Sequence, residues 1–149
     1  MNNNTHKILL YSSVFILVTT WLYVIFSYSN LPDKIVGHMD FSGNVTRYDD
    51  KNIIWLIPAI FTLLSYGVYW LSNQKHNDKN QLKDPAKSKI ATLMSLPYLA
   101  LIAFGLVYTM INKSVNPDFN TYNFMYLSLF LTIILLITLI AYIYKNAKS

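Results

Sequence analysis

Residues 8–28 read ILLYSSVFILVTTWLYVIFSY, a stretch without a single Asp, Glu, Lys, Arg or His. A helix needs about 20 apolar residues to cross the roughly 30 Å hydrocarbon core of a bilayer. The stretch reaches that length, and it is longer than the apolar region of about 7 to 15 residues in a cleaved signal peptide. It therefore predicts an uncleaved membrane-spanning helix.

Three further uncharged runs follow along the chain. With the first they predict four transmembrane helices, at about residues 8–28, 53–71, 90–112 and 121–144. The whole chain is 54% hydrophobic and 13% charged, whereas about a quarter of the residues in a soluble domain are charged. We therefore predict an all-α membrane protein, with residues 1–149 forming a single integral membrane domain.

The basic residues divide unequally between the two sides of this predicted membrane. One side has Lys7, Lys75, Lys79, Lys83, Lys87, Lys89, Lys145 and Lys148. The other side has Lys34, Arg47, Lys51 and Lys113. The positive-inside rule then predicts a bacterial cell-membrane protein with both termini in the cytoplasm and the loop 30–52 outside. The net charge of +5 reflects this topology, so the expected partner is the lipid bilayer and not nucleic acid.

Several residue types are absent where some functions need them. The chain has no cysteine, which excludes disulfides and thiolate metal sites. The four predicted spans contain no ionisable side chain of the kind that lines ion and proton pathways. Pro58 and Pro97 are expected to kink the second and third spans, but they lie at different depths and do not form the matched broken helices of an inverted repeat.

The loop 30–52 is the one long polar segment with a patterned sequence. Residues 34–41 alternate, which places Ile35, Met39 and Phe41 on one face of a strand with Gly37. A turn at residues 42–44, where Gly43 can take a positive φ, would let residues 45–49 pair back. We therefore expect a small extracellular β-hairpin between the first two helices, with its apolar face against helix ends or the membrane interface.

The same loop holds the candidate site residues. They are His38, Asp40, Gly43, Arg47, Tyr48, Asp49 and Asp50. His38 and Asp40 lie two residues apart on one strand face and can meet Asp49 or Asp50, which would make a metal site or a pH-responsive pair. The alternatives are a structural His38 bonded inside the loop, or partner recognition by Arg47 and Tyr48. Asp50 also suits the start of the second helix, and no cofactor is predicted.

The loop resembles a known bacterial family. Its residues Leu31-Pro32-Asp33-Lys34-Ile35, His38, Gly43, Tyr48 and Lys51 are similar to the motif of domain of unknown function 1648. That family usually reads Leu-Pro-x-x-Ile-Pro-x-His-Phe-Asn-x-x-Gly, whereas this chain has Val36 for the second proline and Met39-Asp40 for Phe-Asn. Larger members include an immunity protein that protects a bacterium from its own sporulation-delaying toxin and relays the toxin's presence. The resemblance thus implies immunity or signal reception.

Three functions follow from these observations. The leading hypothesis is a non-enzymatic immunity or sensor protein that recognises an extracellular peptide, a toxin or an envelope component through loop 30–52. The second is a small transporter or a transporter accessory subunit. The third is a metal-dependent membrane enzyme that uses His38 and the nearby aspartates. Independently of the function, the possible partners include a second copy of the chain, in a homo-oligomer, or another membrane protein.

Overall fold

The computed structural model describes residues 4–40, 42–74 and 85–147. Its helices are α1 (Thr5–Ser27), α2 (Leu56–Asn73), α3 (Pro85–Leu93), α4 (Ser95–Val115) and α5 (Tyr122–Ala147). Between α1 and α2 lie the 3-10 turn η1 (Tyr28–Asn30), the strands β1 (Lys34–Met39) and β2 (Val45–Asp50), and the 3-10 helix η2 (Lys51–Trp55). Phe41 of the predicted hairpin and most of the predicted cytoplasmic loop lie outside the described residues.

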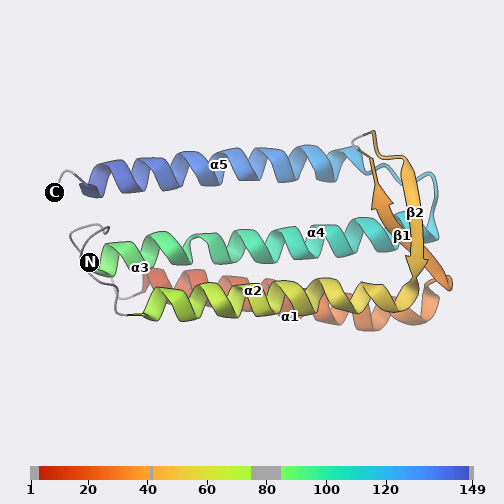
Figure 1. Ribbon diagram of the computed structural model, residues 1–149, viewed down its shortest axis with the longest axis horizontal. Coiled ribbons are helices and arrows are strands. Elements are labelled where there is room, and N and C mark those ends of the chain that lie inside the picture. The colour runs from red at the N-terminus through yellow and green to blue at the C-terminus, as the bar shows by residue number, and fades with distance from the viewer. Residues whose placement is uncertain (1–3, 41, 75–84, 148–149) are drawn as a thin grey trace.

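The helices lie side by side, and the two strands cross one end of them (Figure 1). At the opposite end α1 begins and α5 ends. The strands are antiparallel and pair with each other, so the hairpin predicted between the first two helices is confirmed.

Three helical segments are long and apolar enough to cross a membrane. They are Thr5–Asn30, Lys51–Asn73 and Lys89–Val115, and they match the first three predicted spans. The fourth predicted span coincides with α5, where the apolar stretch among the described residues, Tyr126–Tyr142, is shorter. The molecule is thus mostly helical, with three candidate membrane spans, a further apolar helix and a small antiparallel hairpin.

The prolines mark where two of the helices begin. Pro58 lies in the first turn of α2, directly after η2, where a missing N–H costs no helical hydrogen bond. Pro97 lies in the first turn of α4 and cannot donate to the carbonyl of Leu93, the last residue of α3. The third predicted span is therefore two helical pieces joined at Met94.

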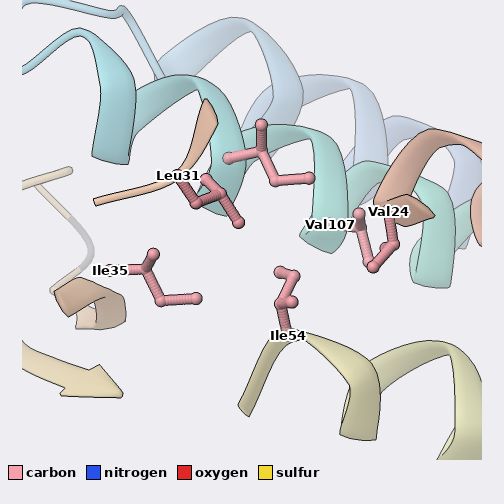
Figure 2. Close-up of a cluster of buried hydrophobic side chains, with 6 residues drawn as sticks. Val24, Leu31, Ile35, Ile54 and Val107 are labelled. Carbon is pink, nitrogen blue, oxygen red and sulfur yellow. The ribbon is translucent and has the colours of Figure 1, made fainter. Parts of the chain in front are cut away.

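A buried apolar cluster holds the hairpin to the bundle (Figure 2). It contains Val24, Leu31, Ile35, Ile54, Val107 and Ile111, contributed by α1, the segment after η1, β1, η2 and α4. Ile35 of the hairpin is completely buried among these helix residues. Burial of one such side chain contributes about 2 to 3 kcal/mol, so the hairpin is part of the folded core at this end of the helices.

Candidate functional site

Strand β1 is covered on both of its faces. Ile35 and Val36 are adjacent, yet both are buried, at 0% and 1% exposure. Ile35 enters the core cluster, while the Val36 N–H donates to Ser114 Oγ of α4 at 2.9 Å. The predicted alternation correctly placed Ile35 toward the bundle. The alternation did not predict that Val36 is buried as well. Its contact partner on α4, Ser114, lies 78 residues further along the chain.

The register of the hairpin is interrupted in the middle of β1. Val36 pairs with Tyr48 and His38 pairs with Arg47, so Gly37 has no opposite residue. A Cβ built on Gly37 would lie 1.9 Å from Asp49 Oδ2. Asp49 Oδ2 also accepts from Arg47, at 3.0 Å from Nε and 2.8 Å from Nη2. Glycine at position 37 therefore gives the Asp49 side chain room to cross the backbone of β1.

Asp40 organises the turn of the hairpin. Its Oδ1 accepts from the backbone N–H of Ser42 at 2.9 Å and of Asn44 at 2.8 Å, and its Oδ2 accepts from Asn44 Nδ2 at 3.0 Å. Gly43 takes φ +72°, as the sequence predicted for this turn. The hydrogen bonds from the Asn44 side chain, and then from the backbone of Asn44, hold the pKa of Asp40 below its usual value.

The tip of the hairpin rests on the start of α5. The Tyr122 hydroxyl donates to the Ser42 carbonyl at 2.7 Å. Thr121 Oγ1 lies so close to Gly43 that a Cβ there would approach it to 2.6 Å. Sequence reasoning missed this contact, because a 122-to-42 pairing leaves no local pattern in the chain.

His38 bonds within the hairpin. Its Nδ1 lies 2.6 Å from Thr46 Oγ1 on β2, and that hydroxyl also donates to the His38 carbonyl at 3.3 Å. In the described part of the chain no hydrogen bond or ion pair joins His38 to Asp49 or Asp50. Among those same residues no group of three or more His, Cys, Asp or Glu side chains is placed to hold a metal ion.

The base of the hairpin is bonded to the start of the second span. Asp50 accepts from the Asn52 N–H at 2.8 Å and so caps η2, as the sequence predicted. Lys51 Nζ lies 3.2 Å from Asp33 Oδ1, and the backbone N–H of Lys51 donates to the backbone carbonyl of Asp33 at 3.0 Å. Tyr28 packs against Trp55 with ring centroids 5.2 Å apart, an aromatic pair of the kind favoured at membrane interfaces.

The outward side of the hairpin is β2. The side chain of Arg47 is 63% exposed and Tyr48 is 57% exposed. β2 pairs with β1 alone in the part of the chain that the structure describes, so its other edge presents backbone groups without a strand partner. The two residues predicted to serve recognition therefore lie next to each other on an open strand edge.

A cavity of about 500 Å³ lies between β1 and the helices. Its lining residues are Val36, Gly37, His38, Met39, Asp40, Leu106, Thr109, Met110 and Phe124. Thr109 is 2% exposed, and its Oγ1 has no hydrogen-bond partner among the described residues. The cavity was not predicted, because its walls come from three segments that are distant in sequence.

Comparison with known proteins finds a similarity in one segment of the chain. Residues 15–62 match the sequence model of the family described as Domain of unknown function (DUF1648). An uncharacterised protein of the archaeon Archaeoglobus fulgidus is 28% identical over 60 residues, which are 40% of this chain and 33% of that protein. The chain thus matches about a third of the relative's length, and no solved structure matches it. From the second half of α1 through the hairpin to the start of α2, the chain is similar to domain of unknown function 1648, as its loop motif predicted.

Proposed function

We propose that this is a non-enzymatic multi-pass membrane protein whose hairpin recognises an extracellular peptide or another envelope component, in an immunity or sensor role. The observation that carries the proposal is the open outer edge of β2, with Arg47 and Tyr48 exposed on it. The match to a family of unknown function is consistent with this role and names no activity.

The edge of β2 suits an extended peptide. A peptide can add a strand to an open sheet edge, where main-chain hydrogen bonds give affinity and neighbouring side chains give specificity. Tyr and Arg are the residue types that most often dominate binding at protein interfaces. Arg47 is held by Asp49 on the same face of β2, so its guanidinium is already oriented, and Tyr48 presents its ring on the other face of the strand.

The hairpin is also rigidly mounted, which favours recognition. Ile35 is buried in the core cluster, Val36 bonds to α4, and Ser42 bonds to α5. A site that is ordered before binding loses less conformational entropy when its ligand arrives. The hairpin therefore has the properties of a preformed docking surface.

The proposed orientation places the hairpin outside the cell. In it, α1, α2, the α3–α4 pair and α5 all cross the bacterial cell membrane, and both termini are cytoplasmic. The lysine bias in the sequence supports this orientation. So does the position of the hairpin at the end of the helices opposite to the start of α1 (Figure 1).

The test is a survival assay in the host bacterium. Deletion of the gene should increase sensitivity to a peptide toxin from neighbouring strains, and the wild-type gene should restore resistance. The double variant Arg47→Ala with Tyr48→Ala should fail to restore it while accumulating in the membrane at the wild-type level. Asp118→Ala, at another exposed position on the same end of the molecule, is the matched control and should restore resistance. Unchanged sensitivity of the deletion strain to a broad toxin panel would count against the proposal.

A further inference from the structure

The cavity between β1 and the helices is separate from the strand edge assigned to peptide recognition. Val36 and Met39 of β1, Leu106 and Met110 of α4, and Phe124 of α5 give it mostly apolar walls. Its volume of about 500 Å³ falls within the roughly 300 to 1,000 Å³ typical of small-molecule sites. An apolar ligand of moderate size therefore fits it.

Two polar groups in the cavity specify more about that ligand. The Thr109 hydroxyl is buried and unpartnered among the described residues, and leaving such a donor unsatisfied costs free energy. A ligand that brings an acceptor into the cavity would remove this cost. Asp40 also lines the cavity, and its lowered pKa keeps the carboxylate charged at neutral pH. A cationic group is its electrostatic complement.

The position of Thr109 along α4 indicates where the ligand comes from. The candidate span Lys89–Val115 has 27 residues, or about 40 Å of helix against about 30 Å of hydrocarbon, so about 5 Å extends beyond each side. Thr109 lies six residues before Val115, about 9 Å from that end. Its hydroxyl therefore lies near the boundary of the hydrocarbon, which is the depth of lipid ester carbonyls.

The cavity is also continuous with the outer surface of this span. Leu106 lines the cavity and is 38% exposed. A bilayer lipid can therefore enter it from the side of the helix.

We propose that the cavity binds a membrane phospholipid with an ammonium headgroup, such as phosphatidylethanolamine. One acyl chain lies against Leu106, Met110 and Phe124, and an ester carbonyl accepts from the Thr109 hydroxyl. The ammonium lies beside the Asp40 carboxylate. This site does not depend on the peptide ligand of β2, and a lipid seated below β1 would stabilise the hairpin in its docked position.

Native mass spectrometry of the full chain, purified in detergent and titrated with phosphatidylethanolamine, tests the proposal. The wild type should retain one lipid. Leu106→Trp fills the cavity and should weaken retention about tenfold. Leu101→Trp is the matched control, because Leu101 is equally exposed at 38% on the same helix and does not line the cavity.

A second pair of variants tests the hydroxyl. Thr109→Val keeps the side-chain shape and should weaken retention about threefold. Ser65→Ala removes another buried hydroxyl for which the described residues supply no partner, and it should leave retention unchanged. If Leu106→Trp does not fold, as judged by circular dichroism, the Thr109 pair still decides the question.

The comparison of headgroups completes the test. Phosphatidylglycerol, which has no ammonium, should be retained more weakly than phosphatidylethanolamine, and equal retention would overturn the headgroup assignment. Equal lipid retention by Leu106→Trp and Leu101→Trp would overturn the cavity as the binding site. These measurements are made without any peptide, so their failure leaves the proposed recognition by β2 standing.

Discussion

Gly43 and Asp40 stabilise the same turn by different means. Gly43 supplies a backbone conformation, φ +72°, that residues with an L side chain rarely adopt. Asp40 supplies acceptors for the N–H groups of Ser42 and Asn44 that the turn leaves without strand partners. The motif that this loop resembles also has glycine at position 43, but it has asparagine at position 40. Both Asn and Asp carry a side-chain oxygen that can accept these hydrogen bonds, whereas only Asp40 adds a negative charge.

Gly43→Ala should destabilise the hairpin by about 1 to 3 kcal/mol, because the new Cβ is strained at a positive φ and meets Thr121 Oγ1. The measurement is amide hydrogen exchange of the hairpin in micelles. Gly67→Ala is the control, since nothing lies within 4 Å of a Cβ at that position. Equal protection of the hairpin in both variants would contradict this explanation of Gly43.

Asp40 should make the turn sensitive to acid. Its folded-state pKa is lowered, mainly by the hydrogen bond from the Asn44 side chain. The stabilisation is therefore complete above the unfolded-state pKa of about 3.9 and is lost as the pH falls through the folded-state value. The backbone amide shifts of Ser42 and Asn44 should titrate in that acidic range. They should not titrate in Asp40→Asn, whereas Asp118→Asn should retain the wild-type titration.

At the scale of elements, β1 is held by helices as well as by its partner strand. An isolated two-stranded hairpin is marginal in water, and this one gains its order from α4, α5 and the core cluster. β2 has the opposite character, because its side chains from Thr46 to Tyr48 are exposed. One strand anchors the hairpin, and the other faces outward.

Ser114→Ala should loosen β1 from α4. The variant leaves the buried Val36 N–H without its acceptor, at a cost of about 1 to 3 kcal/mol. Hydrogen exchange at the Val36 amide should accelerate, and proteases should cut the hairpin faster. Ser72→Ala removes a hydroxyl that, among the described residues, bonds within its own helix turn, and it should change neither measurement. Unaltered exchange at Val36 would show that the Ser114 bond does not hold the strand.

At the scale of the whole molecule, α4 is the helix that joins the parts. It packs against α1 and α2, contacts α5, and supports β1. Tyr98 of α4 shares a hydrogen bond with Thr132 of α5. Many large apolar side chains of α5 are exposed. Their exposure is consistent with contact with lipid, as expected if α5 crosses the membrane in the orientation proposed above.

That orientation can be tested because the chain has no cysteine. The test uses two single-cysteine variants. Ser42→Cys lies on the exposed hairpin tip, and Gln74→Cys lies at the other end of the bundle. In intact cells a membrane-impermeant maleimide should label Ser42→Cys almost completely and Gln74→Cys hardly at all. Permeabilised cells should label both. Labelling of Gln74→Cys alone in intact cells would reverse the proposed topology.

The hairpin shows how much of this fold was predictable. The sequence predicted three of its features: the turn at Gly43, the position between the first two spans and the cap at Asp50. Each of these depends on residues that are close in the chain. The first three candidate spans were also predictable from local sequence, because a helix that crosses hydrocarbon needs a continuous apolar run. The break at Met94 follows from Pro97 and was expected as a kink.

The sequence by itself predicted the first three candidate membrane spans, the position of the hairpin and the similarity of that segment to domain of unknown function 1648. Only the tertiary structure decided what the hairpin residues contact: His38 bonds Thr46, Asp40 caps its own turn, and Val36 binds Ser114. The cavity around Thr109 is likewise a tertiary feature. Local patterns encode helices, turns and caps, whereas contacts between distant segments depend on how the helices pack, and no local pattern specifies that packing.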